Sequence, residues 1–264
     1  MAEPKIKHVQ TEAGRIAYLE AGEGPVLVCL HGLGGGARSW TKQLLALSDR
    51  RRVIAWDCPG YGGSDDYPSK IPTPAQYADV LVAMLDGIGV DGAFDLVGHS
   101  MGGAIAPHVV AKNPGRVRRL VMSSTRVAFA SRSGYEQRLL EHASMSPEEF
   151  GATRAKSMCS PDAPVAAKAT VASIASEIRA SGYAAAVHLL SVCNNAKILK
   201  ALRLPTLVIA GAEDRIAPEA ETAALTGTIP GARREVIGQA AHAAYLEQPA
   251  AFNACLTTFL DAQD

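Results

Sequence analysis

The sequence predicts an α/β fold with a mostly parallel eight-stranded sheet, helices on both faces of that sheet and an inserted helical cap. Three observations indicate this. Short apolar runs alternate with amphipathic segments, which is the pattern of βαβ units. Most of these runs are nearly continuous, as in parallel strands covered on both faces. The alternation stops between residues 126 and 195, where no apolar β-run occurs and Ala, Ser and Glu are frequent.

We expect strands at residues 5–11, 15–20, 26–30, 53–56, 94–98, 117–123, 206–210 and 234–237. The first two are joined near Gly14 and should form an antiparallel hairpin at the sheet edge. The helices between strands carry clear start signals. Thr73-Pro74-Ala75-Gln76 combines a capping box with a proline at the first helical position, and apolar residues then recur at helical spacing.

Residues 1–125 and 196–264 are expected to form the core domain, and residues 126–195 the cap. In the cap segment, Ser146-Pro147-Glu148-Glu149 opens a capped helix, and residues 163–190 predict one or two more. We interpret an all-helical block inside an α/β pattern as an insertion.

Composition excludes several classes of function. Lys plus Arg and Asp plus Glu both total 26, so the net charge is zero and gives no electrostatic basis for binding nucleic acid or an anionic membrane. There is no N-terminal apolar signal segment, and no apolar stretch approaches the roughly 20 residues of a membrane span. The 5 cysteines are scattered without C-x-x-C spacing, so we expect reduced thiols in the cytoplasm and no zinc site.

The stretch Gly98-His99-Ser100-Met101-Gly102 places a serine between glycines directly after an apolar strand. A sharp turn from strand to helix would present the Ser100 hydroxyl at the carboxyl end of the sheet. A hydroxyl is a weak nucleophile until a base takes its proton and a third group orients that base.

Candidate partners for Ser100 follow at the ends of later strands. Asp214 lies just past one strand, and His242 follows the last strand. Taken alone, Asp214 could cap the helix that begins near Pro218, and His242 could be an ordinary loop histidine. After a Gly-x-Ser-x-Gly motif and in this order, they predict a catalytic triad.

Acyl transfer also needs an oxyanion hole, usually made of two backbone N–H groups. We expect these donors at Met101, directly after the nucleophile, and at Leu33, in the loop after the third strand. His31 and Gly32 would shape this loop beside the substrate. The same loop fits G-x-G-x-x-A, and Asp57 ends the next strand, so dinucleotide binding is an alternative. That alternative leaves the triad pattern unexplained.

With these residues placed, the chain resembles the α/β-hydrolase family over nearly its whole length. The matching segments, in order, are His31-Gly32 and residues 56–65, 98–103, 211–218 and 240–249. The resemblance implies Ser100 as nucleophile, His242 as base, Asp214 as acid, and a helical cap that roofs the pocket.

Within the family, the chain is similar to 3-oxoadipate enol-lactonases and related carboxylesterases, notably over residues 182–195 and 197–211. Two features depart from enol-lactonases, which often lack the His31-Gly32 pair and often have Leu at the position of His99. Carbon–carbon hydrolases of aromatic ring-cleavage products form another branch. They tend to have Asn at the position of His99 and Trp at that of Ala243.

The cap is expected to select the substrate. Arg126 is a candidate cation for a carboxylate-bearing lactone, although arginines on helices are usually solvated. Phe129, Tyr135 and His188 are candidates to line an apolar pocket, although packing between cap helices would also explain them.

The sequence therefore predicts a serine hydrolase that cleaves a small carboxylic ester or lactone through an acyl-enzyme, without a metal or organic cofactor. Its expected partner is a small-molecule substrate rather than nucleic acid or a membrane. The alternatives are a carbon–carbon hydrolase and a ligand-binding protein on the same fold. The sequence predicts neither the specific substrate nor the oligomeric state.

Overall fold

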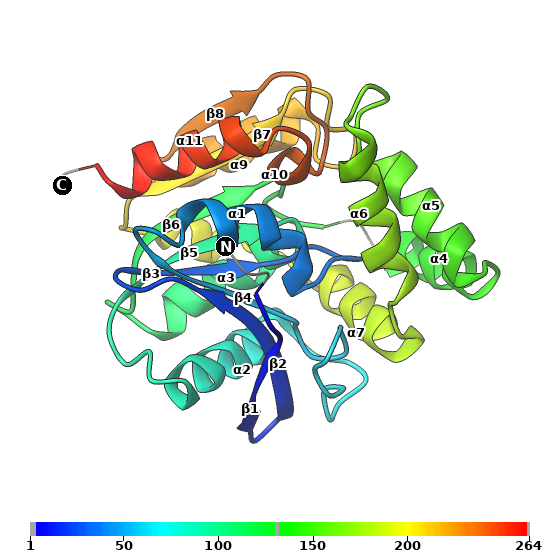
Figure 1. Ribbon diagram of the computed structural model, residues 1–264, viewed down its shortest axis with the longest axis horizontal. Helices are drawn as coiled ribbons and strands as arrows, with labels where there is room; N and C mark the ends of the chain where they lie inside the picture. Colours follow the sequence, from blue (N-terminus) through cyan, green and yellow to red (C-terminus); the bar gives the residue numbers. More distant parts are fainter. Residues whose placement is uncertain (1–3, 130–131, 263–264) are drawn as a thin grey trace.

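The computed structural model describes residues 4–129 and 132–262, and its centre is a twisted sheet with the strand order β1-β2-β4-β3-β5-β6-β7-β8 (Figure 1). The strands are β1 (Lys7–Thr11), β2 (Gly14–Ala21), β3 (Val26–Leu30), β4 (Arg52–Trp56), β5 (Phe94–His99), β6 (Val117–Ser123), β7 (Thr206–Gly211) and β8 (Arg233–Ile237). Strands β1 and β2 form the predicted antiparallel hairpin, β2 pairs antiparallel with β4, and all other pairs are parallel. The predicted fold class is confirmed.

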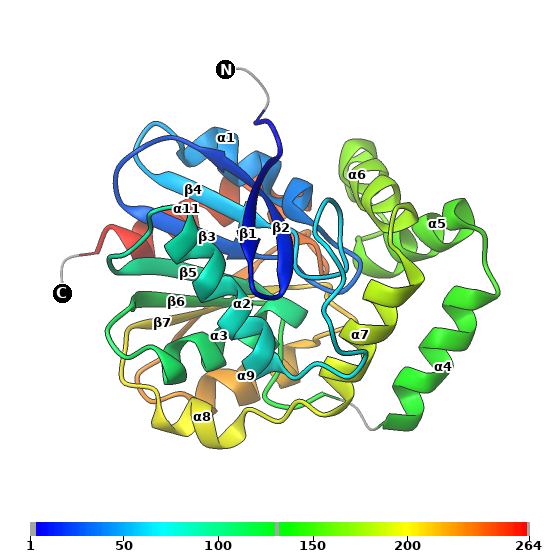
Figure 2. The same cartoon turned by 90° about the horizontal axis from the view of Figure 1, so that it is seen from below.

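Helices cover both faces of the sheet (Figure 2). Outside the segment between β6 and α8, the helical elements are the 3₁₀ turn η1 (Ala37–Trp40) and helices α1 (Thr41–Leu47), α2 (Pro74–Gly87), α3 (Met101–Lys112), α8 (Ala196–Ala201), α9 (Glu219–Thr228), α10 (Ala244–Glu247) and α11 (Pro249–Leu260). Helix α2 begins at the predicted capping box, where the Thr73 side chain accepts a hydrogen bond from the Gln76 N–H.

The alternation of side chains along each strand divides the core into two layers. In β3, Val28 and Leu30 pack on the side of α2 and α3, whereas Leu27 and Cys29 pack on the side of α1 and α11. All four are fully buried. Because both faces are covered, the strand reads as a continuous apolar run, which is the signal that predicted it.

Four helices lie between β6 and α8, in the segment expected to form the cap. They are α4 (Arg132–Ala143), α5 (Pro147–Met158), α6 (Val165–Ser176) and α7 (Ala180–Ser191). Figures 1 and 2 show them grouped beyond one end of the sheet. Helix α5 begins at the predicted Ser146 capping box. Helices α4 and α7 pack together, with the His142 ring stacked on Tyr183 at a centroid distance of 4.6 Å.

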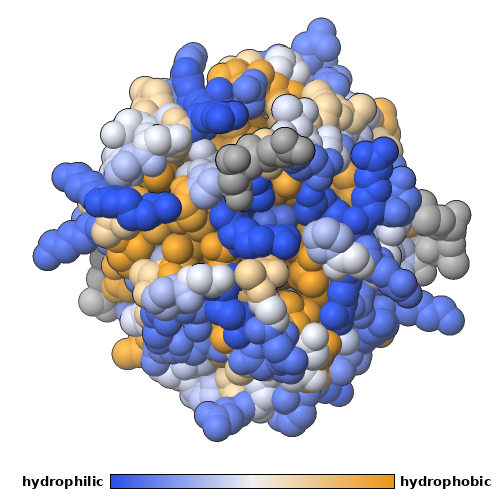
Figure 3. Space-filling model, turned by 90° about the vertical axis from the view of Figure 1, so that its left-hand side faces the viewer, coloured by the Kyte–Doolittle hydropathy of each residue, from blue (hydrophilic) through white to orange (hydrophobic). Residues whose placement is uncertain are grey.

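The cap rests on the loop that follows β4. A Cβ atom on Gly182 of α7 would lie 2.0 Å from the Gly60 carbonyl oxygen, so the two backbones touch there. Next to this contact, Arg179 donates hydrogen bonds to the carbonyl oxygens of Gly62 and Ser64 and to the Asp66 carboxylate. On the opposite side of the molecule, apolar and charged side chains are interspersed on the surface (Figure 3).

Candidate active site

Ser100 occupies a strained turn between β5 and α3. Its backbone has φ 51° and ψ −108°, a conformation that side-chain-bearing residues rarely adopt. Small neighbours make the turn possible, because a Cβ atom on Gly98 would lie 2.6 Å from the Gly102 carbonyl oxygen. The Ser100 N–H donates to the Ser123 carbonyl oxygen at 2.9 Å, which anchors the turn to β6. This is the sharp turn that the sequence predicted at Ser100.

His242 and Asp214 meet across the loops that follow β8 and β7. The His242 Nδ1 lies 2.9 Å from the Asp214 Oδ2, and both residues are buried. The other carboxylate oxygen, Oδ1, accepts hydrogen bonds from the N–H groups of Ile216 and Ala217, each at 2.8 Å. Asp214 therefore organises its own loop and orients His242 at the same time.

The surroundings of Asp214 favour its ionised form. Burial by itself would raise the pKa of this carboxyl group. The His242 ring and the N–H groups of Ala217 and Ile216 act in the opposite direction and hold the pKa below its usual value. The adjacent Glu213 is exposed and accepts a hydrogen bond from the Ser160 hydroxyl at 2.6 Å instead. The geometry thus places Asp214, and not Glu213, against the histidine.

The two expected oxyanion donors come from two separate segments, the start of α3 and the loop after β3. Met101 is the first residue of α3, where backbone N–H groups have no partner within the helix. Leu33 lies in the loop after β3 and lines the same cavity as Ser100. Among the residues that the structure describes, neither N–H has a hydrogen-bond partner. Both are available to an anion that develops beside Ser100.

His31 and Gly32 lie beneath the site and support the loop. The His31 Nδ1 donates to the Gly32 carbonyl oxygen at 2.9 Å, and its Nε2 accepts from the Cys58 N–H at 3.1 Å. These two partners require a neutral ring with the proton on Nδ1. Burial lowers the pKa of His31, which favours the same form. His31 thereby joins the Leu33 loop to the segment after β4.

His99 is a second buried histidine next to the reacting groups. Its Nε2 lies 2.9 Å from the His242 carbonyl oxygen, and its ring packs edge-on against the His242 ring at a centroid distance of 4.8 Å. A carbonyl can only accept, so the proton is on Nε2. Burial lowers the pKa of His99 to about 3, which makes it a neutral support for the His242 backbone.

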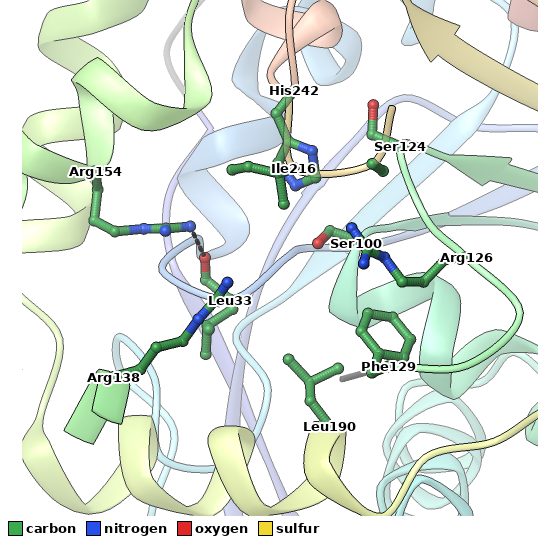
Figure 4. Close-up of a pocket in the computed structure, with 11 residues that line it drawn as sticks. Leu33, Ser100, Ser124, Arg126, Phe129, Arg138, Arg154, Leu190, Ile216 and His242 are labelled. Carbon is green, nitrogen blue, oxygen red and sulfur yellow. Dashed lines mark hydrogen bonds between the residues drawn. The ribbon is translucent and has the colours of Figure 1, made fainter. Parts of the chain in front are cut away.

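Ser100 and His242 open into one small cavity of about 60 Å³ beneath the cap (Figure 4). Of the candidate substrate contacts, Arg126 and Phe129 line this cavity, and His188 is not among its lining residues. His188 lies on α7 two positions before Leu190, which does line it. Residues two apart on a helix are related by a rotation of about 200°, so their side chains point in nearly opposite directions. The Tyr135 side chain lies outside the described part of the structure.

The cavity also contains residues that the sequence analysis did not single out. They are Ser124, Arg138, Arg154, Leu190, Ile216 and Ala217. Ile216 and Ala217 could have been inferred from their place beside Asp214. Arg138 and Arg154 lie within helices α4 and α5, and no local pattern distinguishes them from solvated arginines. Only the packing of the cap brings them to the cavity.

We next consider whether the described residues could bind a metal ion or a dinucleotide. No group of three His, Cys, Asp or Glu residues in the described ranges could hold a metal ion. Asp57, the candidate ribose ligand, accepts hydrogen bonds from the N–H groups of Ala37 at 2.7 Å and Gly63 at 3.1 Å. The Asp57 carboxylate thus stabilises the loops around the site. In residues 4–129 and 132–262, no helix combines the length and apolar character that a membrane crossing requires.

Comparison with curated proteins identifies relatives of the whole chain. A polyketide synthase, ThaQ of Burkholderia thailandensis, is 34% identical over 94% of this chain, although the match spans only 12% of that protein. The 2-hydroxymuconate semialdehyde hydrolase of Pseudomonas sp. strain CF600 is 31% identical, and the match covers 99% of this chain and 96% of that one.

Solved structures agree with this result. A malate-bound thermophilic esterase from Thermogutta terrifontis superimposes with a TM-score of 0.89 at 27% identity, over 97% of this chain and 98% of that chain. The enol-lactonase from Burkholderia xenovorans LB400 has a TM-score of 0.90 at 23% identity, with 97% and 100% coverage, which is a likeness in fold. A family model described as the alpha/beta hydrolase fold matches residues 25–249. The chain therefore belongs to the α/β-hydrolase family, as its motifs predicted.

Proposed function

We propose that this protein is a serine hydrolase that cleaves a small carboxylic ester or lactone. The observation that carries the proposal is the meeting of Ser100, on its strained turn, with His242, held by Asp214, in one cavity. A serine in this setting has a base to take its proton and a carboxylate to orient that base. The esterase among the structural neighbours is consistent with this chemistry.

The reaction would proceed in two steps. Nε2 of His242 takes the hydroxyl proton as the Ser100 oxygen attacks the substrate carbonyl carbon. The resulting tetrahedral oxyanion is stabilised by the Leu33 and Met101 N–H groups, and its collapse expels the alcohol, which His242 protonates. Water activated by His242 then attacks the acyl-enzyme and releases the acid. Asp214 keeps the proton on Nδ1 and stabilises the imidazolium formed in each step.

The test is hydrolysis of a substrate panel by the wild type and by Ser100→Ala. The panel contains short p-nitrophenyl esters, simple lactones, an enol-lactone and a ring-cleavage dienoate. We expect turnover of an ester or lactone that falls by about 10⁶-fold in Ser100→Ala. Ser123→Ala is the matched control, because Ser123 is a buried neighbour that does not line the cavity. Equal rates for wild type and Ser100→Ala would refute the proposed nucleophile.

A second candidate is hydrolysis of a carbon–carbon bond. It is favoured by the 31% identity to a 2-hydroxymuconate semialdehyde hydrolase along almost the full length of both chains. Turnover of the dienoate without turnover of any ester or lactone would select this alternative. A burst of p-nitrophenol equal to the enzyme concentration would instead show that an acyl-enzyme accumulates, and would select the esterase.

A further inference from the structure

Three arginines reach the cavity that holds Ser100 and His242. Arg126 comes from the segment after β6, Arg138 from α4 and Arg154 from α5. None of the lining residues in the described part of the chain is an Asp or Glu. Figure 4 shows the Arg138 and Arg154 side chains extending from the cap toward Leu33, while Arg126 approaches Ser100 from the other side. The described lining of the cavity therefore contains three cationic side chains and no carboxylate, although the whole chain has zero net charge.

Arg154 is the most constrained of the three. One terminal nitrogen donates to the Leu33 carbonyl oxygen at 3.2 Å, and its Nε is buried with no hydrogen-bond partner among the described residues. Burial lowers the pKa of Arg154, and the nearby positive charge of Arg138 lowers it further. A partly buried cation whose Nε donor is buried and unpaired is costly unless an anion joins it. In the described structure, no carboxylate forms an ion pair with Arg154.

The other two arginines differ in their surroundings. Arg126 has Glu221 at 4.0 Å and lies near the Phe129 ring, so part of its charge is balanced within the protein. Arg138 lies across the cavity from Arg126 and close enough to Arg154 to affect its charge. The Arg138 and Arg154 side chains both extend toward Leu33, so an anion bound beside this loop would face both guanidinium groups (Figure 4). This geometry singles out the Arg138–Arg154 pair.

We propose that Arg138 and Arg154 form a subsite for a carboxylate, so that the substrate is a short ester or lactone that carries a second, ionised carboxyl group. This inference rests on the proposed hydrolase function. The planar forks of guanidinium groups match the two oxygens of a carboxylate. The subsite lies beside Leu33, so a bound carboxylate would hold the reacting carbonyl near the oxyanion donors. The cavity is small, about 60 Å³, which favours a short chain between the two groups.

The test compares two esters of nearly equal shape. Monoethyl succinate carries a carboxylate where ethyl 4-methylpentanoate carries an uncharged isopropyl group. We expect the wild type to prefer the anionic ester by about tenfold or more in kcat/KM, from charge-assisted hydrogen bonds. Arg138→Met should lower this preference, measured as the ratio of kcat/KM on the two esters, by about tenfold. Lys156→Met, which removes an exposed charge from α5, is the control and should keep the preference.

Arg154→Met should also lower the preference, and it should slow the neutral ester as well, because the contact with Leu33 is lost. The ratio of kcat/KM for the two esters measures the contribution of the subsite. The rate on the neutral ester measures the effect of the substitution on the oxyanion loop. A wild-type ratio near one, or a ratio that both substitutions leave unchanged, overturns the subsite while the hydrolase function stands.

A binding measurement separates failure of the subsite from failure of the function. If the wild type cleaves neither ester, calorimetric titration of Ser100→Ala with monoethyl succinate still tests the subsite. Binding that Arg138→Met abolishes supports it, and absence of binding overturns it. Tighter binding of inorganic phosphate than of monoethyl succinate would overturn the assignment to a carboxylate.

Discussion

The α/β core and the helical cap supply different parts of this site in different ways. The core places the proposed triad at strand ends: Ser100 directly follows β5, while Asp214 and His242 lie in the loops after β7 and β8. The cap contributes Arg138 and Arg154 from two separate helices. The positions of the proposed reacting groups depend on strand order, whereas the positions of the groups expected to choose the substrate depend on how four short helices pack. Changes in the two regions should therefore have different effects.

The largest expected effect is a loss of catalytic activity on substitution of a core residue. Asp214→Asn should lower kcat by about 10⁴-fold with little loss of stability, because the amide cannot hold His242 in the required tautomer. Glu213→Gln is the matched control and should keep most of the activity, since Glu213 contacts Ser160 and not His242. Steady-state kinetics on a p-nitrophenyl ester would measure both. If Glu213→Gln proved the more damaging change, the acid would be misplaced by one residue.

A smaller effect, on stability and on KM, is expected from a substitution at the contact between cap and core. Gly182→Ala would drive a methyl group into the Gly60 carbonyl, so we expect a loss of about 1–3 kcal/mol in the free energy of unfolding. KM should rise because α7, which carries Leu190, must shift. Gly134→Ala in α4 is the control, since a methyl group there meets no atom of the described structure within 4 Å. Denaturant titration would compare the two, and equal stability would contradict direct backbone contact.

His99 should make the stability of the core depend on pH. Its pKa falls from 6.5 to about 3 on folding. Between these values the unfolded chain binds a proton that the folded chain excludes, so stability is lost as the pH falls below about 6.5. From pH 7 to pH 5, the wild type should lose about 2 kcal/mol more than His99→Leu. Denaturant titrations at both pH values test this, and parallel losses would show that His99 titrates normally.

The smallest effect is expected at the surface that joins cap to core. Arg179→Met should reduce stability by about 1 kcal/mol, because its hydrogen bonds to Gly62, Ser64 and Asp66 are half exposed. Arg38→Met removes the exposed ion pair with Glu177 and should cost less than about 0.5 kcal/mol. Thermal unfolding of the two variants would order them, and a larger loss for Arg38→Met would reverse our account of cap attachment.

Much of the fold followed from local patterns. The eight strands were predicted to within two residues of their observed ends, and the capping boxes at Thr73 and Ser146 mark the starts of α2 and α5. A capping box joins residues only three positions apart, and a buried parallel strand is a continuous apolar run. Both features can therefore be recognised directly in the sequence. The supporting role of His99 was not predicted, because its partner is a backbone carbonyl 143 residues away.

By itself, the sequence determined the fold class and the order of the candidate triad, because parallel strands bring their carboxyl ends to one edge of the sheet. Only the tertiary structure decided which cap residues face that edge. The face that a helix presents depends on its rotation, which packing sets. Thus Leu190 reaches the cavity and His188, on the same helix, does not. The same packing brings Arg138 and Arg154, which come from two separate helices, to the cavity beside Leu33.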